Sequence, residues 1–592
     1  MLSVKLRGIN LTHISLTLVG LMWVLPFLHY RHQYPLTTFN QEWWSALLGV
    51  LALTLLLARD YWRQPEIPRI VQLPAALIAL VLLQLALGMM AYFDQALLYL
   101  LYLLLALLLM MLGSRLRDCF GIEKLAVILA IFLLAGAELS ALIGVLQHYR
   151  WHSPLDAVVV VKVSSGVYGN LAQPNHFANY IALGLISLGL LLQQRKLPAG
   201  FVVLLVIPLL FVLTLSGSRS SWLYLVMMSV LAWWGGRRLP ELRTLLRYCV
   251  LLLAGFAVMH GIVQLSFMTG VSDSTNTLQR MKGADALGGI RLYLWHEAWL
   301  ILKQSPWLGA GFGQFAWQHF QLGPVLRQAN ISGLYNNAHN LIFQLAAEAG
   351  IAGIAVLFAA AGVWLHGLRR TAMSAAHWWC YAILGVLTIH SLLEYPLWYS
   401  YFMVIAAILL GALDETRFSL ELRSVGRMSV AAMLLLGLLS LFQLKSGYEL
   451  LKTTLAIRQV SGNVAEAFER TRDGLIAVHG GSLLSPYADL FMSSYMEVND
   501  DRLQAKLTLN SKVIRFIPIA PVVYRQAFLL AQDGQSEQAR LMFEQAIWSY
   551  PGNAEEHQQL VRLAEKDPAH FGALLEFALK TEQEYVRAIH NK

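Results

Sequence analysis

The chain has 592 residues, of which 57% are hydrophobic and 13% are charged. A soluble domain carries about 25% charged residues, so this composition excludes an ordinary soluble protein and indicates a polytopic membrane protein. The formal net charge of +9 does not indicate a nucleic-acid partner, because most lysines and arginines lie in short loops between apolar stretches, where membrane topology requires them.

About thirteen apolar stretches of membrane-spanning length run from the first residues to about residue 445. Their long unbroken apolar runs favour helices over the short alternating segments of a barrel. The first stretch lacks a small-residue cleavage site and is interpreted as an uncleaved span. The predicted spans are 11–29, 43–58, 69–90, 93–113, 123–147, 177–194, 199–215, 220–235, 245–267, 340–366, 377–393, 397–413 and 428–445.

Alternate connections between these spans differ sharply in their content of lysine and arginine. By the positive-inside rule the basic set is cytoplasmic, which places the N-terminus inside. The loop 148–175, the turn at Arg219, the hydrophilic segment 268–339 and everything after residue 445 then face outward. A re-entrant pair in place of the spans 377–393 and 397–413 would reverse the side of the C-terminal tail.

A polar motif precedes the span at 177–194 and contains three amide side chains, Asn170, Gln173 and Asn175, followed by His176. We expect Asn175 to cap the helix that begins here, and the free N–H groups of a helix start favour an anion. The alternative is a capped helix start whose amides are bonded locally.

The turn Ser216–Trp222 between two spans carries Arg219 on the side where basic residues are scarce. Its guanidinium suits a phosphate-bearing ligand, because a planar fork of donors matches phosphate oxygens. The alternative is an arginine that extends to lipid headgroups.

Within the hydrophilic segment, residues 288–299 predict an amphipathic helix lying on the membrane, with Arg291 as a second phosphate ligand. The glycine-rich run at 305–313 lacks the Gly-Lys-Ser/Thr of a phosphate loop and predicts a tight turn.

The segment ends in a cluster of polar side chains at the start of an apolar helix, and a polar, ionisable cluster at this position predicts a functional site. Histidine titrates near neutral pH, so His339 is a candidate to accept a proton from a hydroxyl group. Glu348, His390 and Glu394 lie within or beside apolar helices and are expected to support this site or to contact one another. The amide and phenol groups around His339 are Tyr335, Asn336, Asn337 and Asn340. No metal-ligand pattern is present in the outer loops, so no metal cofactor is expected.

The tail, 446–592, is predicted to be helical and to serve recognition or scaffolding. Residues 524–553 fit the spacing of one tetratricopeptide (TPR) unit, with a general helical bundle as the alternative.

Four short motifs occur in an order and spacing that resemble the O-antigen ligase/polymerase superfamily, over about residues 200–365. These are Ser-Gly-Ser-Arg219-Ser-Ser-Trp, Arg291 with Trp295, Pro306-Trp-Leu-Gly-Ala-Gly, and Ala-His339-Asn-Leu followed by Glu348-Ala-Gly-Ile-Ala-Gly. The run Gly169-Asn-Leu-Ala-Gln-Pro-Asn-His176, the polar pair His390 and Glu394, and the soluble tail are similar to the protein-glycosylating branch, the PglL-type O-oligosaccharyltransferases of Gram-negative bacteria.

The resemblance implies an all-α membrane enzyme with two parts: a transfer domain, 1–445, and a periplasmic helical TPR-like domain, 446–592. The implied reaction moves a preassembled glycan from undecaprenyl pyrophosphate to serine or threonine of a periplasmic protein such as a pilin. It implies His339 as the essential histidine, Arg219 and Arg291 as pyrophosphate ligands, His176 in a supporting role, and no metal ion. The implied location is the Gram-negative inner membrane, with the active site facing the periplasm.

Four other functions are alternatives. A ligase that moves O-antigen to lipid A-core, or a polymerase that extends the glycan, would use the same donor and the same arginines. A transporter of lipid-linked sugars would predict internal repeats and charged residues along a path at mid-membrane, and neither pattern is seen. A membrane anchor for a binding module would explain the tail and leave the polar loop unexplained.

Overall fold

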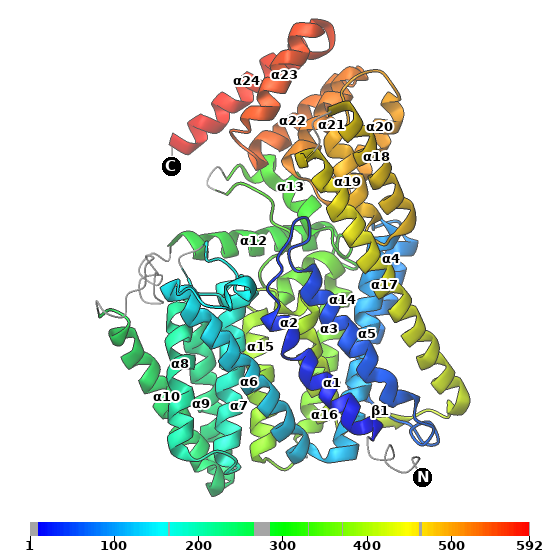
Figure 1. Ribbon diagram of the computed structural model, residues 1–592. Coiled ribbons are helices and arrows are strands. Elements are labelled where there is room, and N and C mark those ends of the chain that lie inside the picture. Colours follow the sequence, from blue (N-terminus) through cyan, green and yellow to red (C-terminus); the bar gives the residue numbers. More distant parts are fainter. Residues whose placement is uncertain are drawn as a thin grey trace. The chain divides into compact units, whose positions relative to one another are not determined.

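The computed structural model describes residues 10–163, 166–265, 285–328, 331–369, 371–460 and 464–590 (Figure 1). The residues of the predicted 268–339 segment that precede 285 lie outside these ranges, as do residues 329 and 330. Within the ranges most of the chain is helical, and the strands form one antiparallel pair, β1 (Glu66–Pro68) with β2 (Arg417–Ser419). The predicted all-α fold is therefore confirmed.

Eight helical segments among the described residues are long and apolar enough to cross a membrane. Helices or helical turns also occur at the other predicted spans, where they are shorter or less apolar, as in α16 (Ser400–Leu413). The protein is therefore a multi-pass membrane protein, whereas the count of thirteen spans and their orientation stay predictions. The eight segments are Leu11–Leu28, Arg69–Ala86, Phe93–Phe120, Ile122–Tyr149, Pro174–Gln193, Pro240–Ile262, Leu341–Leu368 and Arg423–Ile457.

The chain forms two compact units, and the first comprises residues 1–76, 102–287 and 357–441. Its principal helices are α1 (Leu11–Met22), α2 (Leu25–Leu28), α3 (Phe39–Ala52), the C-terminal part of α5 (Phe93–Phe120), α6 (Ile122–Tyr149), α7 (Pro174–Gln193), α8 (Ala199–Leu215), α9 (Ser220–Arg238), α10 (Arg243–Ile262), α15 (Ala375–Ser391), α16 and the start of α17 (Arg423–Val460). Short 3-10 turns link them at Leu53–Leu57, Arg69–Val71, Asp156–Val158, Gly169–Leu171, Pro240–Leu242 and Pro396–Trp398.

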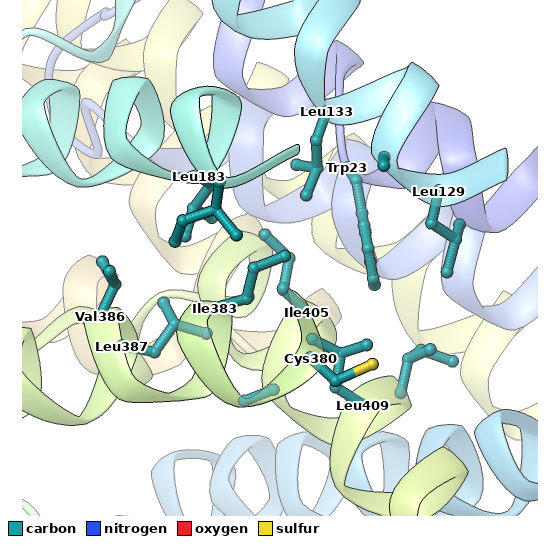
Figure 2. Close-up of a cluster of buried hydrophobic side chains, with 14 of the residues drawn as sticks. Trp23, Leu129, Leu133, Leu183, Cys380, Ile383, Val386, Leu387, Ile405 and Leu409 are labelled. Carbon is teal, nitrogen blue, oxygen red and sulfur yellow. The ribbon is translucent and has the colours of Figure 1, made fainter. Parts of the chain in front are cut away.

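Helix α7 lies at the centre of this unit, with contacts to α6, α8, α9, α10 and α15, and nearly all of its side chains are buried. Small residues permit its close approach to α6, since a Cβ atom added at Gly184 would lie 2.3 Å from the Cβ of Ala137. Figure 2 shows the adjoining apolar core, where Trp23 at the end of α1 lies near Leu183 of α7 and Ile383 of α15. This packing holds the polar start of α7 in place.

The second unit comprises residues 77–101, 288–356 and 442–592. Most of α4 (Gln72–Ala86) and the start of α5 belong to it, together with the first part of α14 (Leu341–Leu368) and the end of α17. Its other helices are α12 (Asp285–Gln304), α13 (Phe315–Leu326), α18 (Val464–Gly481), α19 (Ser485–Tyr495), α20 (Leu503–Phe516), α21 (Ala520–Gln532), α22 (Ser536–Ser549), α23 (Ala554–Lys566) and α24 (Pro568–His590).

The helix–turn–helix expected at 524–553 is present as α21 and α22, which turn at Gly534 with φ of +73°. Ala527, Ala539 and Phe543 are buried between the helices, as the repeat pattern predicts. The same apolar core includes Phe320 of α13, so the C-terminal helices share a core with a helix that begins 24 residues before His339. Assignment to a TPR array, and the domain boundary at 445, stay predictions.

Candidate active site

The start of α7 is a buried polar network within the first unit. The side chain of Gln173 accepts a hydrogen bond from the backbone N–H of His176 at 2.5 Å and is the N-cap. The expectation that Asn175 caps α7 is therefore wrong: Pro174 takes the first helical position, which moves the cap back to Gln173. Asn175 instead donates to the carboxylate of Glu394 at 2.9 Å.

His176 is 3% exposed and is surrounded by rings. Its centroid lies 4.9 Å from Tyr399, 5.3 Å from Phe402 and 5.5 Å from His390. Nδ1 of His390 lies 2.7 Å from the hydroxyl of Tyr224 on α9. The predicted supporting residues His176, His390, Asn175 and Glu394 thus come together at the meeting point of α7, α9 and α15.

The side chain of Asn170 stabilises the loop that precedes α7. Its side-chain amide donates to the carbonyls of Leu28 and Val158, both at 2.8 Å, and its oxygen accepts from the N–H of Val160 at 3.0 Å. Every polar atom of this buried side chain therefore bonds backbone, which makes its role one of shaping the loop.

The turn that carries Arg219 lies close to this loop. A Cβ atom added at Gly166 would be 2.7 Å from the carbonyl of Ser216 and 3.2 Å from the ring of Pro174. The N–H of Val167 donates to the carbonyl of Leu215 at 3.0 Å. Gly166 therefore lies between the two polar motifs of the first unit, at a position that has no room for a side chain.

Arg219 is half-buried and directly precedes α9, whose N-terminal amides and dipole favour an anion. In the described part of the chain, no carboxylate lies within ion-pair distance of its guanidinium. The hydroxyls of Ser218 and Ser221 are buried beside it, again without a partner among those residues. The turn therefore places one guanidinium at a helix start, an arrangement that suits phosphate oxygens.

His339 lies in the second unit, in a turn directly before α14. Its φ of +51° is in the left-handed region, which side chains other than glycine adopt infrequently and often at functional sites. Asn337 stabilises this turn by accepting from the N–H of His339 at 2.7 Å, and Asn340 caps α14 by accepting from the N–H of Ile342 at 2.9 Å. The ring of His339 is partly exposed, whereas Asn337 and Asn340 are buried.

The helix that carries Arg291 is bonded to the turn of His339 through Trp295. The indole N–H of Trp295 donates to the carbonyl of Ala338 at 3.0 Å, and its ring stacks on Phe343 with centroids 5.2 Å apart. Because Arg291 lies four residues before Trp295 on α12, both side chains leave the same face of the helix. The predicted helix at 288–299 is thus present and carries Arg291 toward the turn of His339.

A buried acid–histidine pair that the sequence does not indicate contacts the segment that precedes this turn. Glu297, which is fully buried, lies 2.8 Å from Nδ1 of His319, and Nε2 of His319 lies 3.2 Å from the carbonyl of Gly333. Burial, together with the nearby Glu297 carboxylate, raises the pKa of Tyr293 on the same helix. In the sequence, the four-residue spacing of Tyr293 and Glu297 indicates that they share a helix face. It gives no indication of His319, because that residue lies on another helix.

The glycine-rich run forms the predicted turn. This turn packs against a break in α14 that the sequence does not indicate. Gly350 has φ of +62° inside α14, and a Cβ atom there would lie 2.6 Å from the N of Gly309. The carboxylate of Glu348 accepts from the N–H groups of Gly313 at 3.0 Å and Phe315 at 3.4 Å. Glu348 therefore fixes the turn to the helix that begins after His339.

Tyr335 and Asn336 lie in the extended segment before His339, where the Tyr335 ring is 5.4 Å from that of His319. Tyr335 is partly buried by this contact, and Asn336 is exposed. These two residues thus form the approach to His339 along the chain.

Three family models match parts of this chain. Residues 201–358 match the family described as O-Antigen ligase, residues 167–192 match Protein glycosylation ligase, and residues 378–565 match Virulence factor membrane-bound polymerase, C-terminal. The first match contains Arg219, Arg291 and His339, and the second contains His176.

Two proteins of Acinetobacter baylyi are similar over most of the chain. A "General O-oligosaccharyltransferase" is 27% identical over 468 residues, which is 76% of this chain and 78% of the relative. A "ComP-specific O-oligosaccharyltransferase" is 23% identical over 374 residues, 62% of this chain and 65% of the relative. The resemblance expected from the motifs is thereby confirmed: the chain is similar to O-oligosaccharyltransferases over most of its length, and its central part matches the O-Antigen ligase family.

Proposed function

We propose that this protein transfers a preassembled glycan en bloc from undecaprenyl pyrophosphate to serine or threonine hydroxyls of periplasmic proteins, with pilin-like subunits as acceptors. The names of the two Acinetobacter relatives support a protein acceptor. The observation that carries the proposal is the turn of His339, held at a left-handed φ and bonded through Ala338 to the helix of Arg291.

In the proposed reaction His339 is the general base. It accepts the proton of the acceptor hydroxyl as that oxygen attacks the anomeric carbon of the glycan. The bond from the anomeric carbon to the pyrophosphate oxygen breaks on the opposite face, so the configuration inverts. Partial exposure of the ring and the fixed backbone on both sides of it suit this role.

Arg219 and Arg291 neutralise the charge that develops on the pyrophosphate leaving group. Enzymes often use Mg²⁺ for this purpose, and two guanidiniums supply equivalent positive charge without a metal ion. The absence of an ion-pair partner for Arg219 among the described residues leaves its charge available for the ligand.

The remaining predicted features complete the proposal. Residues 1–445 form the transfer domain in the inner membrane of a Gram-negative bacterium, with the site facing the periplasm. Residues 446–592 form a periplasmic helical, TPR-like domain.

The test is transfer in a glycan-producing Gram-negative host that lacks its own ligase. The protein is co-expressed with a candidate pilin, and wild type is compared with His339→Ala at matched membrane levels. His296→Ala is the control, because His296 is an exposed histidine on α12. A glycan-dependent mass increase on a pilin serine or threonine, lost only in His339→Ala, is the expected result.

A bare pilin together with glycan on lipid A-core would contradict the proposed acceptor. The match of residues 201–358 to O-Antigen ligase makes lipid A-core the principal alternative acceptor. Longer glycan chains on the lipid carrier, with both acceptors bare, would instead identify a polymerase.

A further inference from the structure

Four arginines line one surface pocket of the first unit. The pocket has a volume of about 650 Å³ and lies between residues 59–63 and the first two turns of α17. Arg59 and Arg63 come from the first segment, and Arg423 and Arg427 come from the helix. These arginines belong to the connections predicted to be cytoplasmic, and they lie on segments other than those that carry Arg219, Arg291 and His339.

The walls of this arginine pocket are fixed by a close helix contact. A Cβ atom added at Gly426 would lie 2.2 Å from the ring of Trp62, so α17 rests directly on the indole. Trp62 is 4% exposed and donates its N–H to the carbonyl of Leu56 at 2.6 Å. The pocket therefore exists before any ligand binds.

Nearby arginines of the same unit already have carboxylate partners. Arg115 pairs with Asp60, Arg117 pairs with Glu415 at 2.7 Å, and Arg417 pairs with Asp118 at 2.8 Å. These contacts show that acidic side chains are available close to the arginine pocket.

The arginines of the pocket differ from these neighbours. Across the described ranges, no carboxylate lies within ion-pair distance of Arg59, Arg63 or Arg427. Arg423 has Glu421 at 4.0 Å, with both side chains at least 80% exposed, and such a pair contributes little. The pocket thus concentrates like charge that an anion would stabilise.

The same face of α17 continues as an apolar surface. Arg427, Met428 and Ala431 line the pocket at helical spacing. One and two turns further, Leu435 and Leu439 are 59% and 58% exposed on a helix apolar enough to cross a membrane. A ligand with phosphate groups in the pocket would therefore place its acyl chains along exposed leucines.

We propose that the arginine pocket binds the headgroup of an anionic phospholipid, and that it prefers a lipid with two phosphate groups. Basic pockets between membrane helices bind such headgroups, and guanidiniums hold phosphate oxygens through paired hydrogen bonds. The positive charge of four guanidiniums suits a headgroup with two phosphate groups better than a headgroup with one. Free pyrophosphate shares this chemistry and lacks the acyl chains, so it separates a lipid site from a simple phosphate site.

The test measures lipid binding to the full-length protein in neutral detergent by native mass spectrometry, with cardiolipin, phosphatidylglycerol and phosphatidylethanolamine. The triple variant Arg59→Gln/Arg63→Gln/Arg427→Gln is compared with wild type. The matched control, Arg237→Gln/Arg238→Gln/Arg247→Gln, removes three arginines from another basic region of the same unit. We expect cardiolipin affinity to fall about tenfold or more in the pocket variant and less than about twofold in the control.

Three results would overturn the proposal. Equal losses in both variants would indicate general surface charge, and equal affinity of wild type for cardiolipin and phosphatidylethanolamine would remove the headgroup preference. Displacement of cardiolipin by pyrophosphate at equal concentration would indicate a phosphate site without lipid specificity. If the triple variant aggregates, Arg59→Gln/Arg63→Gln leaves α17 unchanged and serves the same test.

Discussion

The helix starts at His176 and His339 are alike in sequence and different in structure. Both place a histidine among asparagine or glutamine side chains just before or at the start of an apolar helix. His176 is 3% exposed and enclosed by Tyr399 and Phe402, whereas the ring of His339 is partly exposed and its backbone has a positive φ. Composition alone therefore does not separate a histidine that packs from one that is open to a substrate.

The surrounding amides differ in the same way. Around His176, the side chain of Asn170 bonds backbone carbonyls of other segments and so shapes the structure. Around His339, Asn337 and Asn340 bond the backbone within three residues, which leaves the histidine at the tip of a short rigid turn. The bonds of Asn170 to distant segments thus accompany a buried histidine, and the local bonds of Asn337 and Asn340 accompany a partly exposed one.

The largest effect is expected from His339→Ala. Loss of a general base lowers the rate by about 10²- to 10⁴-fold, while the half-exposed ring contributes little to folding. Initial rates of glycan transfer in proteoliposomes, normalised to folded protein by size-exclusion chromatography, measure this. A rate within a few-fold of wild type would remove His339 from the chemistry.

Arg291→Gln should follow, with a loss of about 10²-fold or more, by analogy with deletion of a donor that stabilises developing negative charge. Arg327→Gln is the matched control, since Arg327 pairs at the surface with Glu544 at 3.2 Å and belongs to the same unit. Equal effects of the two variants on the transfer rate would contradict a specific role for Arg291.

Replacements of Glu348 should give a smaller, graded effect. Glu348→Ala leaves the N–H groups of Gly313 and Phe315 without their acceptor, at a cost of about 1–3 kcal/mol for each buried group. Glu348→Gln keeps an acceptor oxygen and should lose less stability. Thermal midpoints and transfer rates should therefore rank wild type, Gln and Ala in that order, and a reversed order would contradict the bracing role.

The smallest effect on rate is expected from His176→Ala. Removal of a buried ring should destabilise the protein by about 1–3 kcal/mol and lower transfer per folded molecule by only a few-fold. Thermal unfolding and transfer are measured on one preparation. A loss of rate comparable to that of His339→Ala, with an unchanged unfolding midpoint, would make the two histidines functional equals.

Much of the fold can be predicted from the sequence because apolar runs of helical length are easily recognised. The positions of the helices, the helix pair at 524–553 and the turn of Gly309 were all predictable from periodicity and glycine content. The cap of α7 was misassigned because Gln173 and Asn175 are both acceptable caps, and the choice depends on the intervening Pro174.

Contacts between distant segments were not predictable. Glu297 and His319 are 22 residues apart on different helices, so no local pattern joins them. Gln84 lies within an apolar helix as an unremarkable polar residue, yet its amide donates to the carbonyls of Leu308 and Glu348, both at 2.8 Å. Such pairings depend on how helices assemble, and a single sequence does not record that.

The bonds of Gln84 have a consequence for biosynthesis. Its carbonyl partners follow it by 224 and 264 residues, and the side chain is fully buried in the finished protein. As the ribosome delivers α4 to the membrane, the amide of Gln84 must stay hydrated or be shielded by an insertion factor until α14 arrives, because an unbonded amide in hydrocarbon is costly. The bonds of Gln84 to Leu308 and Glu348 therefore form late in membrane assembly. A nascent chain that stalls before α14 would leave the amide of Gln84 without these partners, and membrane quality control could recognise it.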